Sequence, residues 1–258
     1  MLDINIEVQK LLLSNKYYYS LKRKKIKQNY WDQKKDPDGN IRNRISNHEK
    51  EKKLFLQNNQ NLIKIIKSLK FKSICDIGCG TGYILSQFSK KKKYLLGIDN
   101  DSHALQIASR YGEVKNVNLN KKTLSINSKF DLVTLYHVIE HIKKPEYLLN
   151  NINKILNKKG FLVLGTPDFD SAMARLYKNK YRMLNDQTHI SLFSSDSLIR
   201  FLRDNKFKIL KIDYPFFNTQ YFSKKNLTNL LSKNKSSSKM TISPPFYGNF
   251  VTILAQKT

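Results

Sequence analysis

Apolar side chains recur along the chain in two alternating patterns, which predict helices and strands in turn. Leu54, Leu62, Ile65 and Leu69 recur at helical spacing, which predicts a helix over 47–70. Short apolar runs bounded by turn residues predict strands over 73–77, 94–98, 114–119, 130–136, 161–165, 207–214 and 249–255. Amphipathic stretches predict further helices over 83–90, 102–111, 144–156, 173–177 and 194–204.

This alternation of short apolar strands with helices is typical of an α/β fold with a Rossmann-like, doubly wound, mostly parallel sheet. A chain of 258 residues suits one such domain with insertions better than two domains. We assign the domain to 47–258 and treat 1–46, which is basic and rich in aromatics, as an N-terminal cap. Two excursions from the domain are expected, at 166–193 and 215–248, and a connection as long as the second is typical of a segment that covers a site.

A glycine-rich turn follows the first predicted strand of this domain. Gly78, Gly80 and Gly82 form the pattern G-x-G-x-G, with Asp76 before them and Asp99 at the end of the next strand. Such a turn lets a ligand approach bare backbone N–H groups, but the glycine that completes a dinucleotide fingerprint is missing. A pyrophosphate would be repelled by Asp76, whereas a ligand with a cationic amine and sulfonium would not. Asp99 is placed to accept hydrogen bonds from ribose hydroxyls.

Four stretches together resemble the motifs of class I S-adenosylmethionine-dependent methyltransferases: 74–82, 96–99, 130–141 and 159–163. The last lacks the proline that usually stands in that motif. The resemblance implies a seven-stranded sheet whose last strand is antiparallel, and S-adenosyl-L-methionine as the cofactor. It implies cofactor contacts from Asp76, Gly78, Cys79, Gly80, Gly82, Asp99, Asn100, Asn118, Leu119 and Tyr136.

Three histidines are candidates for the general base that a hydroxyl acceptor would need, since imidazole titrates near neutral pH. They are His137 and His141, just past the fourth predicted strand, and His189, on the first excursion. Just past the fourth strand, ubiquinone-pathway O-methyltransferases carry the pattern E-x-x-E-H, which is associated with a divalent metal. This chain has His137-x-x-Glu140-His141 there. These side chains are feasible metal ligands. The Glu-His pair also occurs in metal-free relatives, where it caps and orients the helix, and we expect no metal here.

The chain carries 47 Lys and Arg against 20 Asp and Glu, a net charge of +27. The cations are mostly Lys, spread along the chain among many Asn and Ile, as in proteins from AT-rich genomes. The resulting field should still attract anionic substrates. Arg42, Arg44, Arg175 and Arg182 could clamp such an acceptor through bidentate hydrogen bonds.

The cysteines and the apolar runs indicate in which cellular compartment the protein is expected. Cys75 and Cys79 flank the glycine turn and are expected to be small, buried, reduced side chains of a cytoplasmic protein. The first ten residues do not have the pattern of a signal peptide. We expect no membrane span, since no apolar run approaches ~18 residues.

The sequence favours transfer of a methyl group to an O or N atom of a small polar acceptor, sugar-linked or anionic. Methylation of base nitrogens typically uses N/D-P-P-Y/F after the fourth strand, where this chain has Tyr-His-Val-Ile, and no cysteine follows a proline as C5-cytosine chemistry requires. The segment 243–250 and the Thr188-His189 pair resemble methyltransferases associated with surface polysaccharides. An RNA (ribose or tRNA-end) or protein methyltransferase, and an inactive cofactor-binding module, stay as alternatives.

Overall fold

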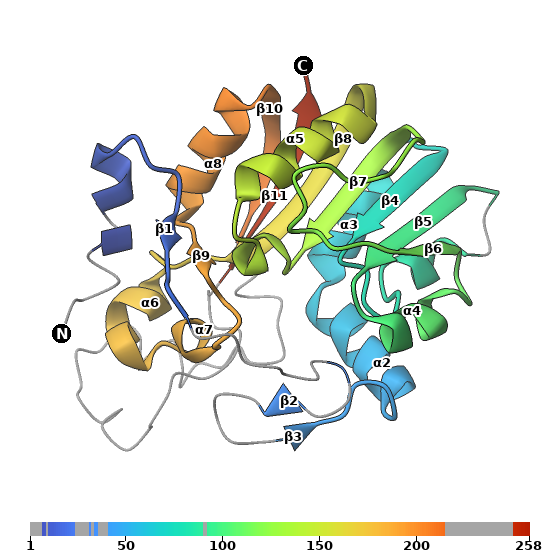
Figure 1. Ribbon diagram of the computed structural model, residues 1–258, viewed down its shortest axis with the longest axis horizontal. Helices are drawn as coiled ribbons and strands as arrows, with labels where there is room; N and C mark the ends of the chain where they lie inside the picture. The colour runs from blue at the N-terminus through green and yellow to red at the C-terminus, as the bar shows by residue number, and fades with distance from the viewer. Residues whose placement is uncertain are drawn as a thin grey trace.

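The central sheet of the molecule contains seven strands (Figure 1). The computed structural model describes residues 7–8, 10–23, 31, 34–35, 41–89, 92–214 and 250–258. The strands of the sheet are β4 (Ser73–Ile77), β5 (Tyr94–Asp99), β6 (Glu113–Asn116), β7 (Phe130–Tyr136), β8 (Leu156–Pro167), β10 (Phe207–Asp213) and β11 (Phe250–Lys257). Their order across the sheet is β10-β11-β8-β7-β4-β5-β6.

The strand directions confirm the predicted fold class. β4 pairs in parallel with β5 and β7, while β5 pairs in parallel with β6 and β7 with β8. β11, the last strand, is antiparallel to both of its neighbours, β8 and β10. The sheet is therefore Rossmann-like and mostly parallel, with an antiparallel last strand. The excursion predicted at 215–248 lies outside the described residues.

Helices cover both faces of the sheet. The main helices are α2 (His48–Asn58), α3 (Gln60–Ser68), α4 (Ser102–Ala108), α5 (Pro145–Ile155), α6 (Ala172–Tyr177), α7 (Arg182–Asn185) and α8 (Ser195–Asp204). Shorter elements are the 3-10 turns η1 (Lys10–Leu13), η2 (Leu85–Gln87), η3 (Ile139–His141) and η4 (Lys178–Lys180), and the strands β1 (Tyr19–Ser20), β2 (Lys34–Lys35), β3 (Ile41–Arg42) and β9 (Ser191–Leu192).

Alternation along the strands divides the core into two layers, because successive side chains of a strand point to opposite faces. On β7, Val133 faces a core shared with α5 and α8, while Leu132 faces a core shared with α3 and α4. The sheet is thus covered on both sides, as the near-continuous apolar strands predict.

The helix predicted over 47–70 is two helices, α2 and α3, broken at Asn59. The Asn59 amide donates to the carbonyl of Phe55 at 2.8 Å, and its side-chain oxygen accepts from the Tyr136 hydroxyl at 2.6 Å. A weak helix former whose side chain is held by the sheet bends the chain here. The single-helix prediction was wrong because that long-range bond is invisible in helical spacing.

The helix predicted over 83–90 was also wrong. The described part contains only the turn η2, and the Ser86 hydroxyl donates to the carbonyl of Tyr83 at 2.7 Å. Serine side chains that bond nearby backbone compete with the helical hydrogen bonds. Strand β8 begins at Leu156, five residues before the predicted start, and therefore includes the polar residues 157–159. These residues lie at an irregularity in the pairing of β8 with β7, and Lys159 has a φ of 59°.

The N-terminal segment packs on the excursion 166–193, which contains α6, α7 and β9. Strand β1 pairs antiparallel with β9. Apolar side chains from both parts form a separate core, which includes Val8, Leu11, Phe169, Met173, Tyr181, Leu184 and Leu192. On the α8 side, the Arg200 guanidinium donates to the carbonyls of Ser14 at 2.6 Å and Leu11 at 3.0 Å. None of the described helices combines the length and the apolar character that crossing a membrane requires.

Replacing Arg200 with alanine should loosen the N-terminal segment from the domain. The variant leaves the carbonyls at the end of η1 without their charged donor, and we expect the free energy of unfolding to fall by about 1–3 kcal/mol. Urea denaturation measures the change, and hydrogen exchange should show lost protection at β1. Arg203→Ala, an exposed position of the same helix, is the matched control, and an equal effect in both variants would contradict the role of Arg200.

Candidate active site

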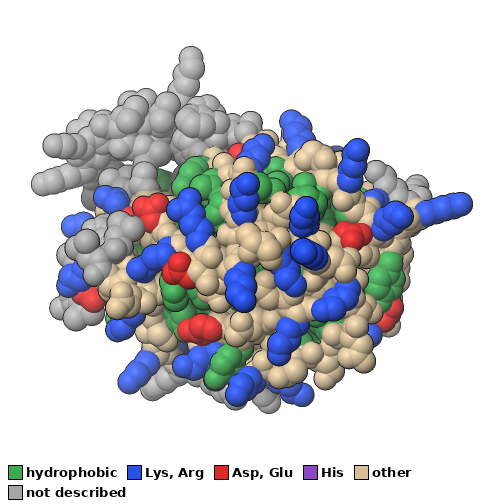
Figure 2. All heavy atoms as spheres, turned by 90° about the horizontal axis from the view of Figure 1, so that it is seen from above, with side chains coloured by type: hydrophobic (Ala, Val, Ile, Leu, Met, Phe, Trp, Pro, Cys, Tyr) green, Lys and Arg blue, Asp and Glu red, His purple; other side chains and the backbone are tan. Residues whose placement is uncertain are grey.

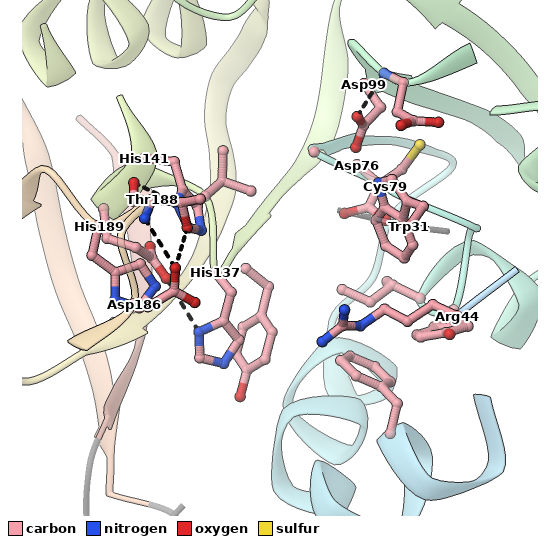
Figure 3. A pocket seen from close by; sticks show the side chains of 18 of the residues that line it. Trp31, Arg44, Asp76, Cys79, Asp99, His137, His141, Asp186, Thr188 and His189 are labelled. Atoms are coloured by element: carbon pink, nitrogen blue, oxygen red, sulfur yellow. Dashed lines mark hydrogen bonds and ion pairs between the residues drawn. The ribbon is translucent and has the colours of Figure 1, made fainter. Parts of the chain in front are cut away.

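A cavity of ≈ 630 Å³ opens at the carboxyl ends of β4, β5 and β7, the edge at which open α/β sheets bind ligands. One half is lined by acidic side chains, among them Asp76, Asp99 and Asp101. The other half is lined by His137 and, from the excursion, His189. Figure 3 shows the two groups facing each other across the cavity.

The glycine turn after β4 forms the floor of the acidic half. The N–H groups of Gly78 and Cys79 both donate to the carbonyl of Ile98, at 2.7 and 3.0 Å, so the turn is fastened to the end of β5. Gly78 has a φ of 69°, and a Cβ there would lie 2.3 Å from the Val138 side chain. Only glycine therefore fits this position, where it lets the Val138 side chain pack against the turn.

Two carboxyl groups in this half are buried, and no basic side chain in the described part of the chain offsets their desolvation. Asp76 is 3% exposed, and burial raises its pKa to about 7 although the Thr134 hydroxyl donates to it at 2.6 Å. Burial also raises the pKa of Asp99, although the N–H groups of Gly80 and Asn100 donate to it at 2.9 and 2.7 Å. A cation bound in this half would relieve the cost of ionising both groups.

The opposite half is organised around Glu140, which is fully buried. Its carboxylate oxygens lie 3.3 Å from His137 Nδ1 and 2.9 Å from the Thr166 hydroxyl, which donates to it. Although burial alone would raise its pKa, the hydrogen bond from His137 and the fields of His141 and His189 hold the pKa of Glu140 at about 2. Glu140 therefore stays ionised and favours a proton on His137 Nδ1.

His137 is held in a strained backbone conformation at the end of β7. Its φ is 56°, in the left-handed region, and its N–H donates to the carbonyl of Gly165 at 2.8 Å. Its ring packs edge-on against Tyr136 and Phe250. Strain of this kind persists where the surroundings fix a side chain for a task. With Nδ1 directed at Glu140, the neutral ring carries its lone pair on Nε2.

His141 and His189 are oriented by backbone carbonyls. His141 Nδ1 lies 3.0 Å from the carbonyl of Thr188, and His189 Nδ1 lies 2.6 Å from that of Met183. Both Nδ1 atoms therefore donate, and both rings have an acceptor at Nε2. Ligand atoms of Glu140, His141 and His189 all lie within 4.8 Å of one another, so these three could hold a metal ion. The sequence-based expectation of no metal stays a prediction.

Comparison with known proteins bears on what this cavity holds. A family model described as a methyltransferase domain matches residues 40–212. The chain belongs to the methyltransferase-domain family. Its fold is that of the class I S-adenosylmethionine-dependent methyltransferases, a class whose reaction is methyl transfer from S-adenosyl-L-methionine.

Individual relatives are distant. The chain is 26% identical over 105 residues to a ubiquinone biosynthesis O-methyltransferase of Coxiella burnetii, which covers 38% of this chain and 45% of that protein. It therefore spans less than half the length of the curated relatives it matches first. A solved methyltransferase of Thermotoga maritima, a possible histamine N-methyltransferase, aligns with a TM-score of 0.55 at 21% identity, covering 83% of this chain and 98% of that one. The N-methyltransferase NodS of Bradyrhizobium japonicum, in complex with S-adenosyl-L-homocysteine, aligns with a TM-score of 0.52 at 15% identity. The alignment covers 78% of this chain and 85% of that one.

The acidic half of the cavity fits S-adenosylmethionine. Its buried carboxyl groups suit a ligand with a cationic amine and sulfonium, and Leu119 offers an apolar wall. The predicted contacts that line the cavity are Asp76, Gly78, Cys79, Asp99, Asn100, Leu119 and Tyr136. Gly80, Gly82 and Asn118 are not among the lining residues: a Cβ on Gly82 would meet Ala108 of α4, and the Asn118 side chain accepts from the N–H of Asn120.

Several lining residues were not predicted. One wall is a face of α2 and the break that follows it, made of Glu51, Leu54, Phe55, Asn58 and Asn59. Two adjacent asparagines inside a helical pattern were the signal that could have found the break. Among the candidate arginines, Arg42, Arg44 and Arg182 line the cavity, whereas Arg175 lies outside it and pairs with Asp170 at 2.8 Å.

Cofactor binding should release a proton from Asp76. Because the pKa of this carboxyl is about 7, it is largely protonated at pH 6, and a bound cation would ionise it. Affinity for S-adenosylmethionine should therefore rise from pH 5 to pH 8. The same raised pKa means that the folded state favours the protonated form of Asp76 over the ionised form. The stability that the protonated carboxyl contributes is therefore lost as pH rises towards 7.

Calorimetric titration at pH 6 in buffers of different ionisation enthalpy measures this proton. We expect the binding heat to depend on the buffer in the natural protein and to lose that dependence in Asp76→Asn, which cannot ionise. Equal buffer dependence in both proteins would assign the proton to another group, of which Asp99 is the nearest candidate.

Proposed function

We propose that this protein transfers the methyl group of S-adenosyl-L-methionine to an O or N atom of a small polar acceptor that is sugar-linked or anionic. The observation that carries the proposal is the pairing of His137 with the buried carboxylate of Glu140, 3.3 Å away, across the cavity from the acidic half. A base and a cation site that share one cavity are what methyl transfer to a hydroxyl requires.

In this proposal, His137 is the general base. Glu140 keeps the proton on Nδ1 and stabilises the imidazolium that forms, which is how a carboxylate supports a catalytic histidine. The cofactor supplies a methyl group on a good leaving group, so most of the remaining work is alignment. His141 and His189 offer acceptors at Nε2 along the same wall, and we propose that they orient the acceptor or share the role of base.

The cavity also supports the acceptor class. A volume of ≈ 630 Å³ lies in the range of small-molecule sites. Arg42, Arg44 and Arg182 line it, and guanidinium groups bind carboxylate and phosphate well. Nucleic-acid binding would favour Lys and Arg side chains gathered into one stripe. On the face seen in Figure 2, these side chains are spread out and form no such stripe.

We also propose the cytoplasm as its compartment. Cys75 and Cys79 are both buried and free, as predicted. Thiols without a disulfide fit a reducing environment.

Substitution of Asp99 should weaken the cofactor complex without unfolding the protein. Asp99→Ala removes charge-assisted hydrogen bonds to the ribose, and we expect a loss of about 1–3 kcal/mol in binding S-adenosyl-L-homocysteine by calorimetry. Asp99 also accepts from the N–H of Gly80, so Asp99→Asn, which keeps an acceptor there, is the control and should lose less. An unchanged dissociation constant in Asp99→Ala would refute this assignment.

An acceptor screen tests the activity itself. Release of S-adenosyl-L-homocysteine is measured with sugar nucleotides, phosphorylated metabolites, RNA and protein as separate arms. Turnover with sugar nucleotides or phosphorylated metabolites supports the proposal, whereas turnover with RNA or protein alone contradicts it. Cofactor binding without turnover in any arm would indicate an inactive binding module.

Once an acceptor is known, the histidines can be separated. His137→Ala should lower kcat by about 10²–10⁴-fold for a hydroxyl acceptor while cofactor affinity stays unchanged. His189→Ala should lower turnover less, because Glu140 and His137 stay in place. The reverse order of effects would move the role of base to His189.

A further inference from the structure

The side chain of Trp31, the only tryptophan of the chain, packs against the glycine turn. A Cβ placed on Gly80 would lie 2.1 Å from Cη2 and 2.3 Å from Cζ2 of Trp31, so the benzo edge of the indole is in contact with Gly80 itself. With the indole in this place, even alanine would not fit at position 80. The φ of Gly80 is 51°, which favours glycine independently.

Trp31 also lines the cavity, together with Asp76 and Cys79 of the cofactor half. Figure 3 shows its ring system beside these two residues and on the cavity side of the turn. The indole therefore stands on the same side of the glycine turn that a ligand of this half must use.

The backbone of Trp31 is fixed from the segment that leads into α2. Its carbonyl accepts from the N–H groups of Arg44 and Ile45, at 2.8 and 3.3 Å. The family match begins at residue 40, so Trp31 lies outside the shared domain. The side chain is half-buried, which leaves part of the indole surface available to a ligand.

We propose that Trp31 is a cofactor-binding residue contributed by the N-terminal segment, with its indole covering the cofactor on the glycine turn. The inference rests on the proposed cofactor site. An indole face attracts a cation and packs on apolar or aromatic groups, and the acidic half has buried carboxyl groups that draw a cationic ligand to the same place. Carboxyl groups on one side and an indole on the other would hold the ligand and exclude water.

Intrinsic fluorescence tests the proposal directly, because every tryptophan photon comes from Trp31. The full chain is titrated with S-adenosyl-L-homocysteine and, separately, S-adenosyl-L-methionine, and calorimetry is run on the same preparation. We expect a saturable change in emission with the dissociation constant that calorimetry gives. Quenching by acrylamide should fall at saturation, because the covered indole becomes less accessible.

Substitution provides the second test. Trp31→Ala should weaken binding of S-adenosyl-L-methionine by roughly 5- to 30-fold, and Trp31→Phe should recover part of the loss. Tyr17→Ala is the matched control: Tyr17 belongs to the same N-terminal segment but packs on Phe201 of α8, so its loss should leave cofactor affinity unchanged. Melting curves confirm that each variant is folded.

The outcomes separate this inference from the proposed function. Absence of binding heat in the natural protein overturns the cofactor site and this inference with it. Binding heat with unchanged emission, increased quenching that shows the indole displaced into solvent, or full affinity in Trp31→Ala overturns this inference alone and leaves the cofactor assignment standing.

Discussion

The half of the cavity that contains the histidines depends on one buried carboxylate, that of Glu140. Its side chain holds His137 at the end of β7 and accepts from Thr166 on β8, while its backbone carbonyl accepts from Ile190 of the excursion at 2.8 Å. Three separate parts of the chain therefore meet at a single residue. A buried charge is stable only with such partners, so the histidine, the strand and the excursion are held in one relative position.

Buried carboxyl groups in the two halves of the cavity have pKa values that are shifted in opposite directions. Around Glu140, histidines compensate burial and hold its pKa at about 2, whereas among the described residues the Thr134 hydroxyl alone lowers the pKa of Asp76, which is about 7. The first carboxylate is satisfied by the protein and can serve a catalytic histidine. The second would be compensated by the cationic ligand of the proposed function. Under the proposed function, this difference in compensation divides the cavity into a cofactor side and an acceptor side.

The elements fixed by local pattern could be predicted from the sequence, and those fixed by distant contacts could not. The strands and the places of Asp76 and Asp99 follow from short apolar runs and the acidic residues that stand beside the glycine turn. The break at Asn59 depends on Tyr136, 77 residues away, and the contact between Trp31 and Gly80 depends on how the N-terminal segment folds back. Residue spacing contains no information about either contact.

The N-terminal segment reaches both halves of the cavity and also packs on the excursion. Trp31 touches the glycine turn, and Arg23 donates to the carbonyl of His189 at 2.9 Å and to Gln187 at 2.8 Å. The family match begins after both residues. The matched residues thus supply most of the sheet and the acidic half, whereas the segment before them helps to fix the wall that contains His189. Under the proposed function, recognition of the acceptor would depend on a part of the chain that the shared methyltransferase domain does not include.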